Sequence, residues 1–486
     1  MTLRSAVLGV LLPVLWLGAG EVRADDPLRL ADEAQHTTRT TVVQADSLAC
    51  GEPTAWGPWP ARGDSNSVRL ENRPMPLWEK TVLVPHYVLG LPFRLVHYTT
   101  EATLTTIDDL GWFELPPIDP RGLQLPGEVY VLPSFSVSGL EGVTYGVGFT
   151  RPHVFGTENL AYLKLASSSR KAETLAGGAF FQLTDRLDLE LGGGYAEMAK
   201  MLYFGLGPFS LEADRSYYER DAHWGGAELE FDLGRGFRTD LLAFFSKVET
   251  EETPEEPHLS LPVVHEGRVP YGFPGESNGW TARLGLLRDT TDQTGRPSSG
   301  SFHQVSLGYF RSSDRGAVEF LRFHANAEHF FPLWHSDRTL ALRGFYNRIE
   351  NEGDEELPFG RMVTFSSPDE LRGYRSMRYY GMGSVGASAE YRWPIWVRHR
   401  RASTGVDAYL FTDAGQVFAR RQEITLPHFE ITGGFGLRLI GSDGGFVGLF
   451  EIGVSDEEPI ISLSLGQNFQ HDRRSLLYGK DPTRKR

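Results

Sequence analysis

The sequence contains almost no cysteine: Cys50 is the only one among 486 residues. A single cysteine has no partner within the chain, so an internal disulfide framework is excluded. Cys50 also lies too far from the N-terminal apolar run to be the lipid-bearing cysteine of a lipoprotein. An exported chain that avoids cysteine fits a bacterial envelope, where stray thiols would be oxidised and could pair wrongly.

Long hydrophobic runs are missing beyond the N-terminus, where residues 5–20 are mostly apolar. Arg4 precedes this run and the small residue Ala24 follows it, as in a secretory signal peptide. An uncleaved membrane anchor is the alternative, but Pro13 and the shortness of the run disfavour it, because a spanning helix needs about 20 apolar residues. We therefore expect a signal peptide over residues 1–24 and no transmembrane helix after it.

The motifs of most enzymes and binding modules are also missing. H-E-x-x-H does not occur, the histidines are scattered, and the acidic stretch 249–257 lacks the spacing of a calcium loop. GMGSVG at 381–386 satisfies G-x-G-x-x-G, but a strand pattern rather than a helix follows it. The formal net charge of −15 argues against nucleic-acid binding. We expect no enzyme, no cofactor, no metal site and no nucleic-acid partner.

What the sequence does contain is glycine and aromatic residues, with 54 Gly, 30 Phe, 18 Tyr and 10 Trp. From about Val129 the apolar residues recur with a period of two. In residues 460–469, Ile461 and Leu463 point one way while Ser462 and Ser464 point the other. Such strands suit a transmembrane barrel with a lipid-facing apolar side, but a soluble sandwich has the same period, so periodicity alone does not choose between them.

Loop lengths favour the barrel. Short connectors alternate with long ones near 197–221, 249–278 and 350–381, as in barrels with short periplasmic turns and long external loops. We predict an all-β fold, a transmembrane antiparallel β-barrel of about 16 strands with an inward-folded extracellular loop. The predicted strands are 129–138, 142–151, 158–167, 173–183, 187–196, 222–232, 237–248, 279–288, 302–311, 318–331, 337–349, 382–394, 403–413, 429–440, 445–454 and 460–469.

The regions outside the predicted barrel are less regular. Residues 25–78 are polar and rich in Pro, Gly and Arg, which indicates a linker. Residues 79–115 mix helical spacing with prolines and fit either a short amphipathic helix at the barrel or an ordinary periplasmic packing segment. The predicted domains are a signal peptide (1–24), a periplasmic linker with a short helical segment (25–126), an outer-membrane β-barrel (127–470) and a basic periplasmic tail (471–486).

A stretch dense in arginine and tyrosine, ELRGYRSMRYYGMG, ends the long loop between the eleventh and twelfth predicted strands. Its Arg372-Gly373-Tyr374 resembles the arginine-glycine-aromatic signature on the sixth extracellular loop of the bacterial surface antigen family, a BamA/TamA-like superfamily of outer-membrane barrels. FTDAG, at the end of the thirteenth predicted strand, resembles the second motif of that family. The resemblance implies that the loop folds into the lumen and that Arg372 contacts Asp413. The motif residues are Arg372, Gly373, Tyr374, Phe411, Asp413 and Gly415.

Strand parity supports an inward Asp413 independently of the resemblance. Phe411, Tyr409 and Asp407 share its face, while Leu410 and its alternate neighbours face lipid. An aspartate in lipid would be costly, and the planar fork of an arginine engages a carboxylate bidentately. Spacing alone would favour two solvated residues on unrelated loops. With both motifs on the matching strands, we predict the pair.

The resemblance covers about residues 130–469 and includes YFGLGPFS, LGLLRDTTDQTGRPSSGSF and AEYRWPIW. It implies a bacterial outer-membrane location, contact with outer-membrane lipid, and a role in inserting or translocating polypeptides or lipids, with a nascent outer-membrane protein as client. Two features depart from the family. The segment before the barrel has no pattern for periplasmic polypeptide-transport domains, as in the subgroup lacking them, and a basic tail follows Phe469. The sequence does not identify a periplasmic partner.

The predicted first and last strands would meet at a seam, marked by Pro133 and Phe469. Pro133 cannot donate to a ladder, so fewer bonds would close the barrel there, unless it merely precedes the true strand start. A weak seam would let the last strand pair with a client strand. The alternative function is a passive outer-membrane channel for small solutes, in which the loop only sets the bore.

Overall fold

The structure is a computed structural model in which every described residue belongs to the second of two compact units, Arg69–Arg486. The predicted signal peptide, most of the predicted linker segment, the basic tail and Phe469 lie outside the described residues. No helix in the described part of the chain is long and apolar enough to cross a membrane. The described residues are 123–138, 142–154, 159–292, 297–313, 318–333, 338–365, 370–397, 405–440 and 447–465.

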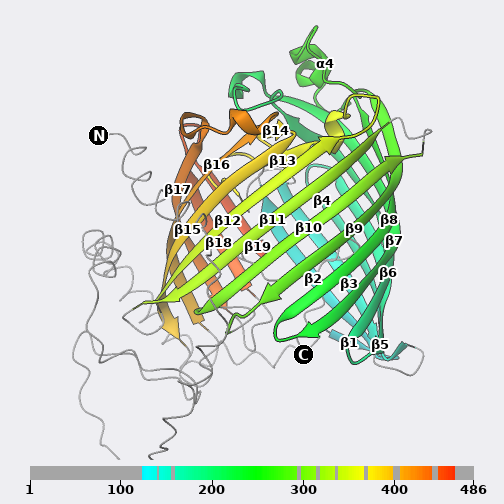
Figure 1. Ribbon diagram of the computed structural model, residues 1–486, viewed down its shortest axis with the longest axis vertical. Helices are drawn as coiled ribbons and strands as arrows, with labels where there is room; N and C mark the ends of the chain where they lie inside the picture. The colour runs from blue at the N-terminus through cyan, green and yellow to red at the C-terminus, as the bar shows by residue number, and fades with distance from the viewer. Residues whose placement is uncertain are drawn as a thin grey trace, which may run out of the picture. The chain divides into compact units, whose positions relative to one another are not determined.

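Antiparallel strands make up most of the described residues (Figure 1). A 17-stranded sheet contains all of them except a short second pair, β13 (Val363–Phe365) with β14 (Tyr379–Gly381). The strands of the large sheet are β1 (Leu123–Leu125), β2 (Val129–Ser138), β3 (Gly142–Pro152), β4 (Leu160–Ser168), β5 (Ala172–Thr184), β6 (Leu187–Tyr203), β7 (Ser216–Gly234), β8 (Phe237–Glu251), β9 (Gly275–Asp289), β10 (Gly300–Ser312), β11 (Glu319–Pro332), β12 (Thr339–Asn351), β15 (Gly383–Val397), β16 (Gly405–Phe418), β17 (Glu430–Ile440), β18 (Val447–Val454) and β19 (Ile460–Leu465).

The pairings run around a full circuit. Neighbours in sequence pair from β2 to β12, β12 pairs with β15, and the series continues to β19, which pairs with β2. Each of the predicted strands overlaps one strand of this circuit, so the predicted all-β antiparallel barrel is confirmed. The sequence reading missed the three-residue strands β1, β13 and β14.

The junction between β19 and β2 is the sparsest in the circuit. Among the described residues it has one paired position, Leu463 with Val137. By contrast, β2 pairs with β3 from Tyr130 to Ser138 without interruption. Pro133 lies inside β2, opposite Val147, so the reading in which it precedes the strand start is wrong.

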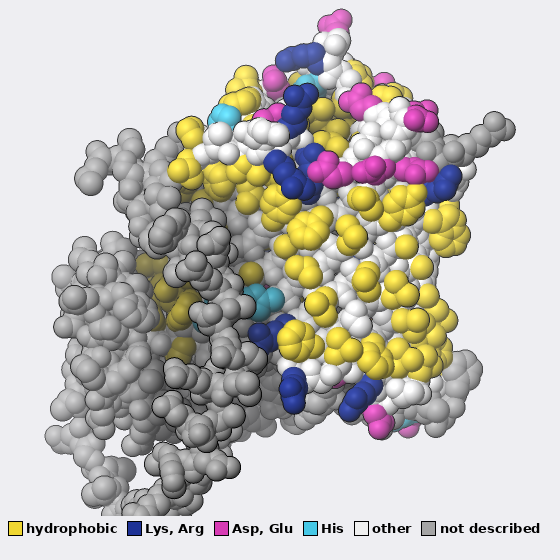
Figure 2. Space-filling view, in the orientation of Figure 1, with side chains coloured by type: hydrophobic (Ala, Val, Ile, Leu, Met, Phe, Trp, Pro, Cys, Tyr) yellow, Lys and Arg dark blue, Asp and Glu magenta, His cyan; other side chains and the backbone are white. Residues whose placement is uncertain are grey.

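The outer face of the strands is apolar over a broad band (Figure 2). Leu241, Leu284 and Leu307 are register neighbours on β8, β9 and β10, and each leaves more than half of its surface exposed. A water-soluble sheet would bury such a face, so this band is the surface that a bilayer covers. Other exposed apolar residues on the strands include Leu163, Leu175, Leu191, Leu229, Trp280, Val305, Phe323 and Ile461.

A row of acidic residues marks the upper limit of the band at the long-loop end. The row follows the ladder across five neighbouring strands, and each member has the parity of an exposed leucine on its own strand. Figure 2 shows Asp and Glu side chains gathered along this upper edge. Lys247 lies 3.0 Å from two of the carboxylates and neutralises part of their charge. The members of this acidic row are Glu173, Glu197, Asp221, Glu249 and Glu276.

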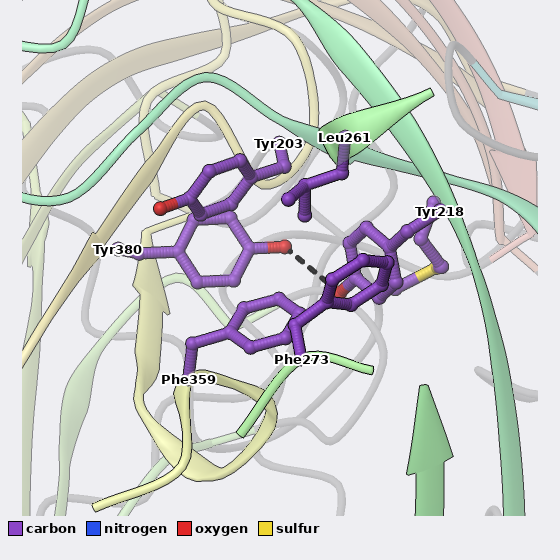
Figure 3. Close-up of a cluster of buried hydrophobic side chains, with 7 residues drawn as sticks. Tyr203, Tyr218, Leu261, Phe273, Phe359 and Tyr380 are labelled. Carbon is purple, nitrogen blue, oxygen red and sulfur yellow. Dashed lines mark hydrogen bonds between the residues drawn. The ribbon is translucent and has the colours of Figure 1, made fainter. Parts of the chain in front are cut away.

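Three long loops meet above the strands in a cluster that we call the aromatic cap (Figure 3). Tyr380 donates a hydrogen bond from its hydroxyl to the Leu202 carbonyl at 2.9 Å, and the Tyr218 hydroxyl lies 3.1 Å from the Tyr380 hydroxyl. Because the contributing segments are far apart in sequence, the cap ties the loops to one another. Its residues are Met201, Tyr203, Tyr218, Leu261 of α4 (Leu261–Val264), Phe273, Phe359 of η4 (Phe359–Arg361) and Tyr380.

His265 packs beside the aromatic cap. Its ring lies edge-on to Tyr203, with centroids 5.0 Å apart, and its Nε2 lies 2.9 Å from the Asp214 carbonyl oxygen. A carbonyl only accepts, so Nε2 carries the proton in the neutral ring. Burial lowers the pKa of His265, and the hydrogen bond to Asp214 offsets only part of that effect.

Acidification should loosen the loop around His265. The pKa of His265 is lower when the loop is closed than when it is open. As pH falls below about 6.5, the open loop therefore binds a proton more readily than the closed loop does. The closed form loses stability with falling pH until the pH reaches the pKa of the closed form. Hydrogen exchange of residues 258–266 should therefore accelerate between pH 7.5 and 5.5, by up to about tenfold per pH unit beyond its intrinsic change. His265→Gln retains a donor and does not titrate. An equal acceleration in this variant would contradict the assignment.

A charge placed in the apolar band should destabilise the barrel. Leu284→Arg should lower the free energy of unfolding in a bilayer by about 2–4 kcal/mol, because a cation near the midplane loses its hydration. Val263→Arg is the matched control, since Val263 is equally exposed but lies on α4 among the loops. Denaturant titration in vesicles measures both variants. Equal effects would show that the band does not face lipid.

Candidate functional site

The segment after β13 returns into the barrel and carries the arginine-glycine-tyrosine motif. Residues 370–378 connect β13 to β14, and Leu371, Arg372 and Tyr374 are almost fully buried. A charged, polar segment inside a protein needs partners for every group it buries. The wall of β15–β18 provides these partners.

Arg372 contacts Asp413 of β16 through three hydrogen bonds. Its Nε donates to Oδ2 at 2.9 Å, its Nη2 donates to Oδ1 at 2.6 Å, and its backbone N–H donates to Oδ2 at 3.2 Å. Thr432 of β17 adds a hydroxyl 3.3 Å from Oδ2. The carboxylate therefore receives a two-pronged guanidinium contact and two further donors while its side chain has no exposed surface.

Two more carboxylates complete the surroundings of Arg372. Its Nη1 contacts Glu390 of β15 and lies 3.2 Å from Oε1 of Glu451 on β18. Arg392 donates from Nε to the other oxygen of Glu390 at 2.8 Å, and the Tyr409 hydroxyl donates to Glu451 at 2.8 Å. The loop is thus held by one acidic residue from each of three strands. We call Arg372, Arg392, Asp413, Glu390 and Glu451 the ion cluster.

The ring of Phe411 packs against the guanidinium of Arg372 in the ion cluster. The guanidinium carbon of Arg372 lies 3.7 Å from the centroid of its ring, a cation–π distance. The ring lies flat over β17, since a Cβ on Gly434 would come within 2.4 Å of it. Gly415, also in the second motif, leaves room for Phe365 of β13, which a Cβ at this position would meet at 2.2 Å.

Glycine at position 373 allows the loop backbone to touch the wall. A Cβ on Gly373 would lie 2.8 Å from the backbone carbonyl of Val454, and a Cβ on Gly453 would lie 2.2 Å from the Arg372 carbonyl oxygen. The Ser455 hydroxyl donates to the Gly373 carbonyl at 2.8 Å. Facing glycines therefore set the depth at which Arg372 enters the ion cluster.

Tyr374 packs against the wall above the ion cluster. Its ring belongs to a buried group with Leu371, Phe345 and Tyr379, among others. Its hydroxyl lies 2.9 Å from Oε2 of Glu430 and 2.5 Å from Oδ1 of Asp456. Burial, followed by the neighbouring anionic and phenolic groups, raises the pKa of Tyr374, so it remains a neutral donor.

Arg378 fastens the far end of the motif segment to two other loops. Its Nε donates to Glu457 at 2.7 Å, and its Nη1 and Nη2 donate to the hydroxyl and carbonyl of Ser210 at 2.8 Å each. Its guanidinium also lies over the rings of Phe204 and Tyr379. The loop is therefore fixed at both ends of the motif.

The structure brings together all six motif residues named from the sequence. The seam pair is only partly described, because Pro133 lies in β2 while Phe469 lies outside the described residues. Sequence reasoning did not assign Glu390, Glu451 or Arg392 to the site. Counting parity along the strands, as for Asp413, would have placed Glu390, Arg392 and Glu451 on the inner face. The sequence did not give the register of the strands, and the register decides which inward side chains meet at Arg372.

The arrangement is structural in character. No nucleophile lies beside a general base in the ion cluster, and no group of three His, Cys, Asp or Glu residues in the described part of the chain could hold a metal ion. The cluster can hold a loop in a fixed position across the lumen.

Comparison with known proteins agrees with this geometry. Residues 271–443, which include Arg372 and Asp413, match the Omp85 superfamily domain. No curated protein matches the sequence. BamA from Haemophilus ducreyi lacking POTRA domains 1–3 is similar in structure, with a TM-score of 0.52 and 14% identity over 70% of this chain and 69% of that one. At 14% identity, this similarity shows a shared fold and does not by itself show a shared function.

Two CdiB structures are more distant. CdiB from Acinetobacter baumannii has a TM-score of 0.46 and 12% identity over 70% of this chain and 60% of that chain. CdiB from Escherichia coli has a TM-score of 0.47 and 11% identity over 71% and 63%. The chain thus spans less than two thirds of either CdiB.

The barrel fold, the apolar outer band and the matched domain define the class: this is a bacterial outer-membrane β-barrel protein. Within that class, residues 271–443 match the Omp85 superfamily domain, and the fold is BamA-like. The resemblance seen in the sequence is confirmed.

Removing the central guanidinium should release the loop. Arg372→Ala leaves three neighbouring buried carboxylates without their shared cation, which should cost about 3–5 kcal/mol. Limited trypsin digestion should then cleave after Arg375 and Arg378 many times faster than in the parent protein. Arg421→Ala is the control, because Arg421 is 68% exposed and lies 3.7 Å from Glu350. Unchanged cleavage in Arg372→Ala would contradict a locking role.

Proposed function

We propose that this protein inserts or translocates polypeptides at the outer membrane, and that a client strand pairs at the β19–β2 seam. The observation that carries the proposal is that the described residues pair at one position at that junction. The superfamily assignment supports it, since the resemblance implied the same role. The proposal includes a lumen occupied by the loop that Arg372 and Asp413 hold.

The edge of β19 that faces β2 offers backbone groups to which a client strand could hydrogen-bond. Ile460–Leu465 pairs with β18 along six positions, from Ile460 to Leu465, but meets β2 only at Leu463. Backbone groups without partners are costly in lipid, at several kcal/mol each. An incoming strand would satisfy them by adding to the sheet, and a client that forms its own ladder could then leave.

The position of the ion cluster determines which side of the seam is held. Its carboxylates lie on β15, β16 and β18, next to β19 on the C-terminal side of the seam. We infer that the C-terminal wall is the fixed side. The N-terminal strands would move when the seam opens.

The passive channel remains the alternative function, because part of the lumen is open to solvent. Arg322 of β11 has the inward parity of the buried Phe320 and Phe330, yet it is exposed. Single-channel recording in planar bilayers separates the two functions. A mostly closed barrel with brief openings supports the translocase, whereas a steady open pore supports the channel.

Locking the seam should abolish the proposed activity. In a Cys50→Ser background, Val137→Cys with Leu463→Cys places two thiols at the one paired position, where antiparallel Cα spacing suits a disulfide. Vesicles containing this variant should lose acceleration of the folding of an unfolded outer-membrane barrel protein, and a reductant should restore it.

A matched disulfide away from the seam is the control for this experiment. Val147→Cys with Leu165→Cys joins β3 and β4 at an ordinary paired position and should leave the acceleration unchanged. If the seam disulfide forms and the acceleration persists under oxidising conditions, strand pairing at this seam is not the mechanism. If the parent protein never accelerates folding, the insertase function itself is wrong.

A further inference from the structure

Three arginines line the lumen away from the ion cluster, and none of them has a carboxylate partner within the described part of the chain. They are Arg220 on β7, Arg322 on β11 and Arg361 in η4. Other inward arginines are neutralised: Arg283 lies 2.8 Å from Asp240 and 3.0 Å from Glu228. None of the ion pairs formed by the described residues involves Arg220, Arg322 or Arg361.

Arg361 enters the wall between β8 and β9 and meets only neutral acceptors. Its Nη1 donates to the Ser246 hydroxyl at 2.8 Å, its Nη2 donates to the Ser277 carbonyl at 2.6 Å, and its Nε donates to the Ser277 hydroxyl at 3.2 Å. The guanidinium also lies 4.6 Å from the centroid of Phe310. These contacts hold the side chain in place but leave its charge without a counter-ion.

Arg322 joins Arg361 from the opposite side. Its Nη2 donates to the Arg361 carbonyl at 2.8 Å, which places the two residues in direct contact. The remaining donors of the Arg322 guanidinium have no protein acceptor among the described residues. Its neighbour in register on β10 is Gly308, where a Cβ would meet nothing closer than 3.8 Å. An exposed inward arginine beside a glycine indicates space in front of the guanidinium.

Arg220 approaches the same place from β7. It pairs in register with Thr250, and a Cβ on Gly360, next to Arg361, would lie 3.4 Å from the Thr250 methyl carbon. It has the same parity as Tyr218 and therefore lies directly beneath the aromatic cap. Three segments far apart in sequence thus bring positive charge to one part of the lumen.

Such a grouping is unfavourable without a ligand. Like charges held close together repel, and the repulsion is stronger inside a protein lumen than in bulk water because the effective dielectric is lower. Neutral side chains could fill a structural role here without this repulsion, as the neutral Ser246 and Ser277 do in the β8–β9 wall. Guanidinium groups gathered beside open space are a usual means of holding an oxyanion.

We propose that Arg220, Arg322 and Arg361 form a binding site for a phosphate-class oxyanion beneath the aromatic cap. A phosphate group carries close to two negative charges at neutral pH and offers several acceptor oxygens, so it matches three arginines better than a single carboxylate does. The phosphate can be free inorganic phosphate or the headgroup of a phosphorylated lipid. The site does not depend on the proposed insertase function.

Thermal unfolding of the full chain in detergent tests the site. Inorganic phosphate should raise the Tm relative to chloride at equal ionic strength, because it binds only the folded state. Arg322→Gln should weaken the phosphate response by about tenfold or more in apparent affinity, since it removes a charged donor pair. The same variant should raise the Tm in chloride, because it relieves repulsion with Arg361. A merely structural arginine would lower it.

Arg421→Gln is the matched control, because it removes an exposed arginine and should leave the phosphate response unchanged. If Arg322→Gln fails to fold, Arg220→Gln gives the same test. Equal Tm values in phosphate and chloride, together with the absence of bound phospholipid, would overturn the site. So would an unchanged response in the arginine variants.

Native mass spectrometry distinguishes the two sources of phosphate. A phospholipid retained by the parent protein and lost in Arg322→Gln identifies a lipid headgroup. A Tm response to inorganic phosphate without retained lipid identifies the free anion. A phospholipid retained equally by both proteins, with no response to phosphate, contradicts the proposal.

Discussion

The contact between one buried arginine and the carboxylates around it determines the rest of the interior. The side chains of a barrel this wide do not fill its lumen, so a loop enters and brings polar backbone with it. Arg372 compensates the charge of Asp413, Glu390 and Glu451 at once, and the facing glycines 373 and 453 allow it to reach them. Removing water from these ions offsets much of their attraction, so the cluster contributes position more than net stability.

Much of this architecture could be read from the sequence because a bilayer imposes a simple rule. Lipid requires apolar side chains on one face of every strand, so a period of two locates strands and shows which residues point inward. This is why the sequence alone places Asp413 and Phe411 on the inner face. The pairing of Arg372 with Asp413 needed the family resemblance as well, since parity does not identify a partner on a distant loop.

The features that the sequence did not reveal have physical causes of their own. The expected strands 187–196 and 222–232 stop short of β6 and β7, because above the lipid the outer face turns polar, at Glu197 and Asp221, while the ladder continues. Strands β13 and β14 are too short to show a period. Glu451 and Glu390 meet at Arg372 only because the registers of β15–β18 align them, and register is a property of the whole sheet.

The acidic row across β5–β9 sets the vertical position of the barrel. Carboxylates directly opposite one another repel along the ladder, and hydrocarbon around them would raise that cost sharply. On the β5–β9 side, the barrel therefore cannot move deeper into the bilayer than the acidic row, whatever the thickness of the surrounding membrane. A bilayer thicker than the apolar band must thin locally beside these strands. The height of the band therefore sets the thickness of the adjacent lipid.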